Sequence, residues 1–339
     1  MNLLVTGGCG FIGSNLIRRI VERAEIDRLV NLDCLTYAGN PANLRAVEDR
    51  KNYHFEQVDL RDKPAVLDVV ARHEITHVMH LAAESHVDRS IAGPDDFIQT
   101  NVVGTFHLLE ACRAVWGEAF EGSRFLQVST DEVYGSLGPE GFFTEASPHA
   151  PNSPYSASKS AADMLVRAYH RTYGLPAVTT NCSNNYGPFQ YPEKLIPVVI
   201  QSVVERRQIP VYGDGMNVRD WLYVEDHADA LWLALNEGVV GETYNVGGGN
   251  EWPNIRIVEL ICDLIDEFRP DLGGASRELI AFVEDRPGHD RRYAVDAGRI
   301  ERDLGWIPAH DFESGIRKTV RWQLDNQRWI EDLRQGERS

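Results

Sequence analysis

Short apolar runs alternate with amphipathic stretches through the first half of the chain. The apolar runs lie at 2–6, 28–33, 53–59, 77–83, 124–130 and 176–183. Helical patterns separate them, as at 11–24. Strands that are apolar on both faces are typical of a parallel sheet covered by helices on both sides. Because parallel strands are joined by right-handed crossovers, the pattern predicts an α/β chain with a doubly wound, Rossmann-type sheet.

Two stretches predict long helices. The first, 94–116, begins with Pro94 and two aspartates, which suit the start of a helix and its dipole. The second, 153–174, ends at Gly174. Both carry apolar residues on more than one face, so we expect one face to pack on the sheet and another on a partner subunit.

The pattern loosens after about residue 183, where prolines and glycines become frequent. This predicts a smaller substrate-binding domain built from loops and short elements and interleaved with the sheet. We assign 1–183 and about 219–248 to a dinucleotide-binding domain. About 184–218 and 249–330 are assigned to the smaller domain.

A glycine-rich segment, "VTGGCGFIG", follows the first predicted strand and opens the first predicted helix. It contains G-x-G-x-x-G at Gly8, Gly10 and Gly13, and G-x-x-G-x-x-G when Gly7 is counted instead. Glycine lets the backbone turn tightly and approach a pyrophosphate at the helix N-terminus. Asp33 ends the next strand, where a carboxylate accepts hydrogen bonds from ribose hydroxyls and repels a 2′-phosphate. No arginine follows it closely, so the motif predicts NAD rather than NADP; the alternative is a turn that only caps a helix.

Two further strand ends reach the expected cofactor cleft. Asp59 would lie near the adenine, and Ala82 and Ala83 near the pyrophosphate or the nicotinamide ribose. For Asp59, an ordinary loop carboxylate is nearly as good an explanation.

Charge and cysteine content narrow the class of partner. The chain has 51 acidic and 34 basic residues and a net charge of −17, which opposes non-specific binding to nucleic acid or anionic membranes. It has no apolar run as long as a membrane span and no signal-peptide pattern at its start, so we expect a cytoplasmic protein. Five widely spaced cysteines without C-x-x-C indicate a reducing compartment. We expect no metal site.

The segment "YSASK" places Tyr155 and Lys159 four residues apart, on one face of a helix. A free tyrosine has a pKa of about 10, and a nearby ammonium favours its phenolate form. The pair can then remove a hydroxyl proton while hydride leaves the same carbon. The alternative interpretation, the S-x-x-K of serine acylases from Ser156, lacks the S-D-N and K-T-G motifs that accompany it.

The order of glycine loop, acidic strand end, "STDEVYG" (129–135) and "YSASK" resembles the extended short-chain dehydrogenase/reductase family over most of the chain. The resemblance implies that Thr130 joins Tyr155 and Lys159 in a hydride-transfer triad. It also implies a homodimer formed through the two long helices. Tyr155 and Lys159 would contact the cofactor as well. The other cofactor contacts carried over from the family are Phe11, Ile12, Cys34, Leu35, Thr36, Leu60, Leu81, Ser85, Thr100 and Asn185.

Asp131 and Glu132 are not explained by the triad. Oxidation or 4-epimerisation of a sugar needs no further acid and base, whereas loss of water does. Once C4 is a ketone the C5 proton is acidic, so one carboxylate can remove it while a protonated partner delivers a proton to the C6 oxygen. Repulsion between adjacent carboxylates helps to keep one of them protonated. Tyr134 is interpreted as a packing residue.

Longer segments resemble the nucleotide-sugar 4,6-dehydratases of this family, at 35–40, 79–91, 180–197, 219–231 and 285–296. The implied reaction converts dTDP-glucose to dTDP-4-dehydro-6-deoxy-glucose and water, with NAD⁺ regenerated, Glu132 as base and Asp131 as acid. The alternatives are a 4,6-dehydratase, 4-epimerase or decarboxylase acting on another nucleotide sugar such as UDP-glucose, and a non-catalytic NAD-binding protein.

The resemblance also assigns the substrate contacts. They are Ser85, Thr130, Asn184, Lys194, Leu195, Arg219, Asn254, His289, Arg292 and Tyr293. The physical case is strongest for Lys194, Arg219 and Arg292, because an acidic protein needs local cations to bind a diphosphate. For Arg292 a surface charge is an equally good explanation.

Overall fold

The structure, a computed structural model, describes residues 1–285 and 290–336. Its largest feature is a seven-stranded sheet with the order β10-β6-β5-β4-β1-β2-β3, in which every neighbouring pair is parallel. The strands are β1 (Asn2–Thr6), β2 (Arg28–Asp33), β3 (Tyr53–Gln57), β4 (His77–His80), β5 (Arg124–Thr130), β6 (Ala177–Cys182) and β10 (Thr243–Val246). The predicted doubly wound α/β fold is confirmed.

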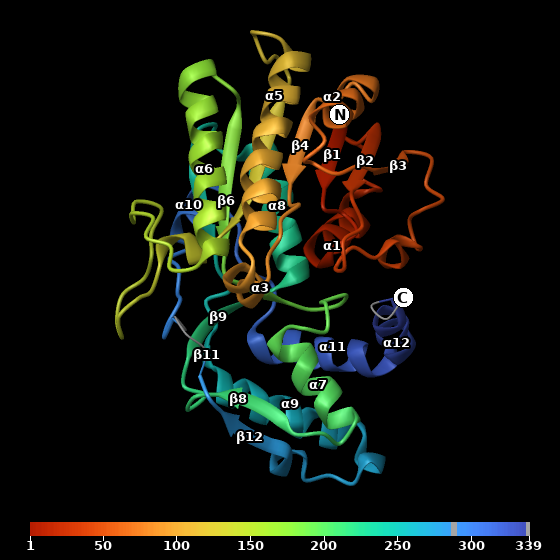
Figure 1. The fold of residues 1–339 in the computed structure, drawn as a ribbon, viewed down its shortest axis with the longest axis vertical. Coiled ribbons are helices and arrows are strands. Elements are labelled where there is room, and N and C mark those ends of the chain that lie inside the picture. The colour runs from red at the N-terminus through yellow and green to blue at the C-terminus, as the bar shows by residue number, and fades with distance from the viewer. Residues whose placement is uncertain (286–289, 337–339) are drawn as a thin grey trace.

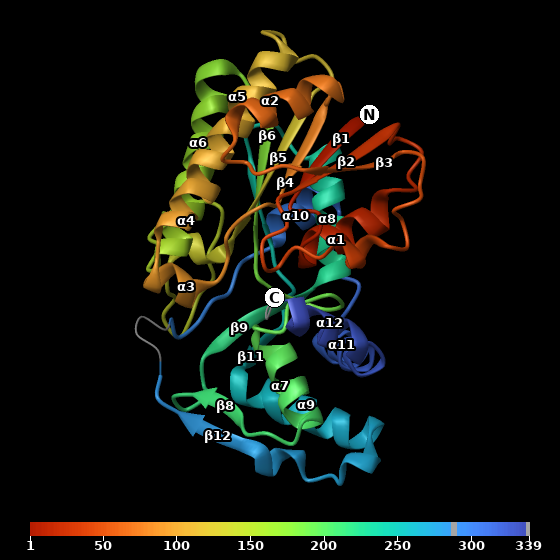
Figure 2. The same cartoon turned by 45° about the vertical axis from the view of Figure 1, so that its right-hand side comes forward.

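Helices cover both faces of this sheet (Figures 1 and 2). One face carries α1 (Phe11–Ile20), α8 (Val224–Glu237) and α10 (Gly298–Leu304), and the other carries α2 (Lys63–Arg72), α5 (Thr105–Trp116) and α6 (Pro154–Tyr173). The side chains of β1 show why both faces must be apolar. Leu3 and Val5 pack into one core and Leu4 into the other, because successive side chains of a strand point to opposite faces.

The first predicted long helix is interrupted by a wider turn. It starts as α4 (Asp95–Phe97), continues as a π-helical segment, η2 (Ile98–Gly104), and becomes regular in α5. Buried Asn101 in η2 donates hydrogen bonds to Ser158 of α6 and to the backbone of Glu84. Single π-turns of this kind often accompany functional sites, and this one brings η2 against the chain that follows β4.

The second predicted long helix, α6, has the limits that its sequence predicts. Ser153 caps its N-terminus through a reciprocal capping box with Ser156, and Pro154 occupies the first turn. Gly174 ends it in the left-handed conformation, with φ of 76°. The capping box fixes the start of the helix close to Tyr155.

A smaller unit lies at the carboxyl ends of the strands and has its own apolar core (Figures 1 and 2). It contains a three-stranded sheet, β11-β9-β7, and a two-stranded parallel sheet, β12-β8. The strands are β7 (Asn184–Tyr186), β8 (Ile209–Tyr212), β9 (Val218–Tyr223), β11 (Glu251–Pro253) and β12 (Ile280–Val283). Its helices are α7 (Leu195–Val204), α9 (Asn254–Phe268), α11 (Phe312–Asp325) and α12 (Gln327–Gly336).

The remaining elements are short connections. They are η1 (Pro41–Leu44), α3 (Val87–Ala92), η3 (Asp131–Tyr134), η4 (Pro270–Leu272) and η5 (Ser276–Leu279). The two units interleave, since β9 pairs with the small sheet whereas α8 and β10, next in sequence, pack on the large one. The domain limits given above stay a prediction. Within the described residues, no helix is both long and apolar enough to cross a membrane.

Candidate active site

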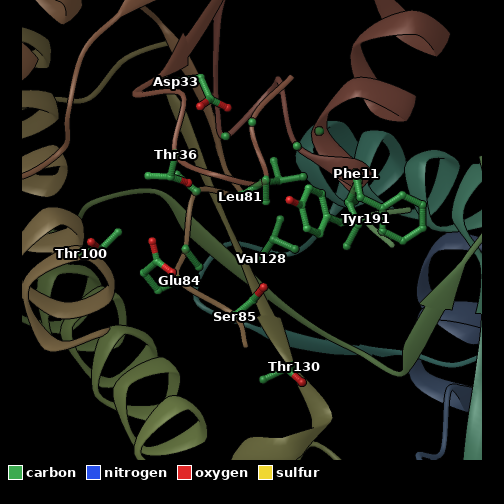
Figure 3. A pocket seen from close by; sticks show the side chains of 18 of the residues that line it. Phe11, Asp33, Thr36, Leu81, Glu84, Ser85, Thr100, Val128, Thr130 and Tyr191 are labelled. Carbon is green, nitrogen blue, oxygen red and sulfur yellow. The ribbon is translucent and has the colours of Figure 1, made fainter. Parts of the chain in front are cut away.

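A cavity of about 440 Å³ lies at the carboxyl ends of the parallel strands, where a doubly wound sheet binds its ligand. In Figure 3, Asp33 and Thr130 lie at opposite ends of this cavity, with Leu81 and Ser85 between them. Many of the predicted site residues line it. They are Gly7, Gly10, Phe11, Ile12, Gly13, Asp33, Cys34, Thr36, Asp59, Leu60, Leu81, Ala82, Ala83, Ser85, Thr100, Thr130, Glu132, Tyr155, Lys159, Asn184, Asn185 and Lys194.

The glycine loop at one end of the cavity has no room for side chains at two positions. A Cβ on Gly7, whose φ is +71°, would lie 2.8 Å from the Ala82 backbone, and one on Gly13 would lie 2.2 Å from the Gly7 carbonyl. The loop leads directly into α1, with Gly10 at the N-cap and no side chain capping the helix. A bare helix N-terminus beside a glycine loop fits a dinucleotide pyrophosphate.

Asp33 lies in the cavity wall with its carboxylate held by backbone hydrogen bonds. Its carboxylate accepts hydrogen bonds from the backbone N–H groups of Cys9 (2.9 Å) and Leu35 (2.8 Å), which fix its orientation at the end of β2. Burial raises the pKa of Asp33, and these two hydrogen bonds oppose that rise. Asp33 lines the cavity, and its carboxylate has lone pairs left that can accept hydrogen bonds from hydroxyl groups. Leu35, a predicted cofactor contact, donates its backbone N–H to Asp33 but does not line the cavity.

An arginine that the sequence analysis did not connect with the site also lines the cavity. Arg61 forms ion pairs with Asp59 and with Asp96, and its hydrogen bonds keep the pKa of Asp59 below the ordinary value. The Asp59 carboxylate is therefore paired with the Arg61 guanidinium. Arg61 lies only two residues from Asp59, so the sequence could have suggested that pair. Asp96 comes from a distant segment that only the fold brings near Arg61.

Tyr155, Lys159 and Thr130 meet at the other end of the cavity. Tyr155 is 9% exposed. Burial, and after it the charge of Glu132, raise its pKa well above the ordinary value, and a hydrogen bond with Thr130 opposes that rise. Lys159 lines the same cavity, and its ammonium donates to the Val128 carbonyl of β5 at 2.8 Å. That its charge favours the phenolate form of Tyr155 stays a prediction.

Asp131 and Glu132 are held in different environments. Asp131 is 2% exposed and accepts a hydrogen bond from the Thr130 hydroxyl at 3.3 Å, whereas Glu132 lines the cavity. Burial raises the pKa of Asp131 well above its ordinary value, and the charges of Glu132 and Asp220 raise it further while Arg219 lowers it. Its second carboxylate oxygen has no hydrogen-bond partner among the described residues. One carboxyl of the pair is thus kept in the acid form mainly by burial, with the repulsion anticipated from sequence as the second cause.

Several predicted substrate contacts lie outside the cavity wall. They are Leu195, Arg219, Asn254, Arg292 and Tyr293, while His289 lies outside the described residues. Arg219 is buried, donates to the backbone carbonyl groups of Val218 and Asp290, and stacks over the Tyr293 ring. Arg292 forms two hydrogen bonds with Glu251, of 2.7 and 2.9 Å, and another with the Gly141 carbonyl. The structure therefore places Arg292 in a salt bridge.

The wall also contains polar residues that sequence reasoning missed. Glu193 accepts a hydrogen bond from Tyr37 and lies 3.6 Å from both His86 and Lys194. Other missed lining residues are Glu84, Gln190 and Tyr191. These residues lie in the segments 79–91 and 180–197. The resemblance of those segments to the dehydratases was the feature of the sequence that could have pointed to them. No group of His, Cys, Asp and Glu that could hold a metal ion occurs in 1–285 or 290–336.

Comparison with known proteins identifies the family of the chain. The family model described as GDP-mannose 4,6 dehydratase matches residues 4–319. The chain is 57% identical to the dTDP-glucose 4,6-dehydratase of Neisseria meningitidis, over 98% of this chain and 96% of that protein. It is 54% identical to dTDP-glucose 4,6-dehydratase 1 of Escherichia coli K12, over 99% and 96%. The solved structure of a dTDP-glucose 4,6-dehydratase from Streptomyces venezuelae with NAD bound covers 98% of this chain and 100% of its own, with a TM-score of 0.91 and 45% identity.

Proposed function

The chain belongs to the dTDP-glucose 4,6-dehydratase family, and from this premise we propose how its residues remove water from dTDP-glucose. It is an NAD-dependent hydro-lyase that forms dTDP-4-dehydro-6-deoxy-glucose. The observation that carries the mechanism is the unequal pair beside Tyr155, in which Asp131 is buried and Glu132 faces the cavity.

NAD fits the chain's own residues. The glycine loop and the start of α1 would hold its pyrophosphate, and Asp33 its adenosine ribose. When bound, NAD⁺ supplies a hydride acceptor for C4 of the sugar and afterwards a hydride donor for C6.

Tyr155 removes the proton from the C4 hydroxyl. Tyr155 lines the cavity beside Thr130, and in the phenolate state the Thr130 hydroxyl would donate to the phenolate oxygen instead of to Asp131. Burial raises the pKa of this phenol, so the phenolate would depend on the Thr130 hydrogen bond and on the positive charges of Lys159 and of NAD⁺ when it is bound. The C4–O bond becomes a carbonyl, which makes the C5 proton acidic.

Glu132 and Asp131 then carry out the elimination. Glu132 takes the C5 proton, and Asp131, held in its acid form by burial, gives its proton to the C6 oxygen. The C6–O bond breaks, water leaves, and a C5–C6 double bond forms. When C6 has received hydride, Glu132 returns its proton to C5.

The proton balance gives Thr130 a second role. Each turnover leaves Tyr155 with one proton more and Asp131 with one fewer than at the start. The Thr130 hydroxyl is hydrogen-bonded to Asp131 at 3.3 Å and to Tyr155, so it lies between the group that has gained a proton and the group that has lost one. We assign it the transfer that restores both.

Product analysis tests this function. The purified protein is incubated separately with dTDP-glucose, UDP-glucose and GDP-mannose, and the sugar product is identified by NMR and mass spectrometry. We expect a 4-keto-6-deoxy sugar, lighter than the substrate by one water, with dTDP-glucose preferred in kcat/KM. Exclusive formation of a C4 epimer, or of the keto sugar from UDP-glucose alone, would establish the alternative function.

Assembly and location complete the proposal. We infer a homodimer formed through the face shared by α5 and α6, because Met164 and Tyr173 on α6 are each 46% exposed. Light scattering should give twice the chain mass of 38.2 kDa, and a stable monomer would contradict the dimer. All five cysteines are free thiols, which supports a cytoplasmic location.

A further inference from the structure

A third ionisable residue lies in line with the two catalytic residues of α6. Asp163 follows Lys159 by four residues, as Lys159 follows Tyr155, so the three side chains share one face of the helix. Asp163 is only 4% exposed. The mechanism above gives this buried carboxylate no role.

Strand β5 holds Asp163 and Lys159 next to each other. Ser129 donates a hydrogen bond to one carboxylate oxygen of Asp163 at 2.6 Å, and Gln127 donates to the other at 3.2 Å. The carbonyl of the residue between them, Val128, accepts the hydrogen bond from the Lys159 ammonium. Three consecutive residues of one strand therefore fix a buried carboxylate and a buried ammonium on the same helix face.

The two groups influence each other's charge. Burial lowers the pKa of Lys159, and the negative charge of Asp163 is the largest influence that raises it. Burial raises the pKa of Asp163 to about 6, against the effect of Lys159 and its two hydrogen bonds. Asp163 thus changes charge within the pH range in which enzymes work, whereas Lys159 depends on that charge.

A second cavity, of about 210 Å³, is lined by Asp163. Lys159 lines the first cavity and Asp163 the second, and the two cavities share no lining residue among residues 1–285 and 290–336. The second cavity also contains the Asn181 side chain, whose buried carbonyl oxygen has no partner within the described part of the chain. A polar cavity of this size admits water, so Asp163 can exchange protons with solvent without passing through the substrate site.

The charged surroundings of Asp163 come from several elements. Lys159 acts from its own helix, and the Tyr134 hydroxyl of η3 is influenced by its charge. The other titratable or charged groups facing the second cavity are Glu145, His149, Arg167, His170, Arg171, Glu242 and Arg299. Arg299 is already paired with Glu242, so Lys159 is the cation most directly coupled to Asp163.

We propose that Asp163 is a positioning residue for Lys159, whose carboxylate, open to solvent through the second cavity, keeps Lys159 protonated where Tyr155 removes the substrate proton. The inference rests on the proposed function only in its last step. Above a pH of about 6 Asp163 is ionised and supports the ammonium. Below it the carboxylate takes up a proton from the second cavity and the support is lost.

Nitrogen NMR of the lysine side chains tests the proposal without any substrate. The chain has only five lysines, and Lys159→Met identifies the Lys159 signal. In the wild-type protein we expect that signal to shift with a midpoint near pH 6, as Asp163 ionises. In Asp163→Asn the Lys159 signal should show no step near pH 6, and the pKa of Lys159 should fall by about one unit or more.

A matched variant separates the charge from the hydrogen bonds. Ser129→Ala keeps the carboxylate but removes one donor, so the midpoint should move to higher pH while Lys159 stays protonated at neutral pH. With substrate, the alkaline limb of kcat, where Lys159 loses its proton, should move to lower pH in Asp163→Asn. A Lys159 signal without any step in the wild type, or an unchanged Lys159 pKa in folded Asp163→Asn, overturns the proposal. If Asp163→Asn fails to fold, the wild-type and Ser129→Ala titrations decide the question.

Discussion

At the scale of single residues, the active site depends on how differently two adjacent carboxyl groups are buried. Thr130 ends β5 and caps the 3₁₀ turn η3, so the extended strand gives way to a turn at Asp131 and Glu132. Asp131 turns inward beside β9, where Asp220 and Arg219 influence it, while Glu132 turns to the cavity. Because burial disfavours the charged form, we assign the acid role to the inner residue and the base role to the outer one.

The base can be tested by removing its charge without changing its shape. In Glu132→Gln, Tyr155 still accepts the C4 proton, so reduced cofactor should form in a single turnover. Water loss should then stop, with kcat lowered by roughly 10²–10⁴-fold. Cofactor absorbance and product formation are followed in parallel, with Tyr155→Phe as the control that should block both. Unaltered turnover by Glu132→Gln would refute the base assignment.

The buried acid form of Asp131 should affect stability as well as activity. The folded-state pKa of Asp131 is raised, so folding is favoured by its protonation, and that contribution is lost as the pH rises through the raised pKa. Asp131→Asn should therefore raise Tm at neutral pH while lowering kcat by about 10²–10⁴-fold. The gain in Tm should disappear at acidic pH, where Asp131 is protonated in both states. A lower Tm at neutral pH would show that Asp131 is not buried as an acid.

At the scale of elements, the site is made by the ends of strands and the starts of helices. The glycine loop between β1 and α1 approaches the chain after β4 so closely that Gly7 nearly touches Ala82. β5 serves two purposes, since its end supplies Thr130 and its middle holds Lys159 and Asp163 on α6. The redox and elimination residues therefore share a single strand–helix unit.

The close packing of the glycine loop gives a prediction for one methyl group. A Cβ on Gly13 would overlap the backbone of Gly7 and Gly8, so Gly13→Ala should cost about 1–3 kcal/mol of stability and weaken NAD binding about tenfold or more. Calorimetric titration and thermal unfolding measure both. Gly93→Ala is the matched control, because a Cβ at that position would have no neighbour within 4 Å among the described residues. Equal NAD affinity in the two variants would contradict the role of the glycine loop in binding NAD.

At the scale of the whole molecule, the C-terminal helices tie the smaller unit to the glycine-loop side of the sheet. Trp329 of α12 donates a hydrogen bond to the Asn43 side chain of η1 at 2.8 Å. Its ring lies 5.2 Å from Trp322 and 5.9 Å from Phe189, while Arg18 of α1 stacks over Phe189. Residues 286 positions apart in the sequence therefore meet in this cluster.

This cluster predicts a coupling between the end of the chain and the cofactor site. Trp329→Ala removes two ring contacts and should cost about 1–3 kcal/mol. Trp329→Phe keeps the rings but loses the indole donor, at a cost of about 1 kcal/mol. Thermal unfolding and NAD titration of both variants measure the effect. If Trp329→Ala unfolds at the wild-type temperature, α12 is not part of the cooperative fold.

The features that depend on local spacing could be predicted from the sequence alone. Strand and helix periodicity predicted the parallel sheet, the glycine spacing predicted the dinucleotide loop, and the four-residue spacing from Tyr155 predicted the shared helix face. Gly174 predicted the end of that helix. These features follow from backbone periods and turn geometry, which act over a few residues and are written in adjacent positions.

Which charges are buried, and which partners they meet, depended on the folded arrangement of the chain. The fold placed Asp131 inside and Glu132 at the cavity, bound Lys159 to a strand carbonyl, and joined Arg292 to Glu251. Burial and pairing depend on segments that are distant in sequence but adjacent in space, and they govern pKa values more strongly than sequence neighbours do. For that reason the residue types of the site could be predicted from the sequence, whereas their protonation states required the fold.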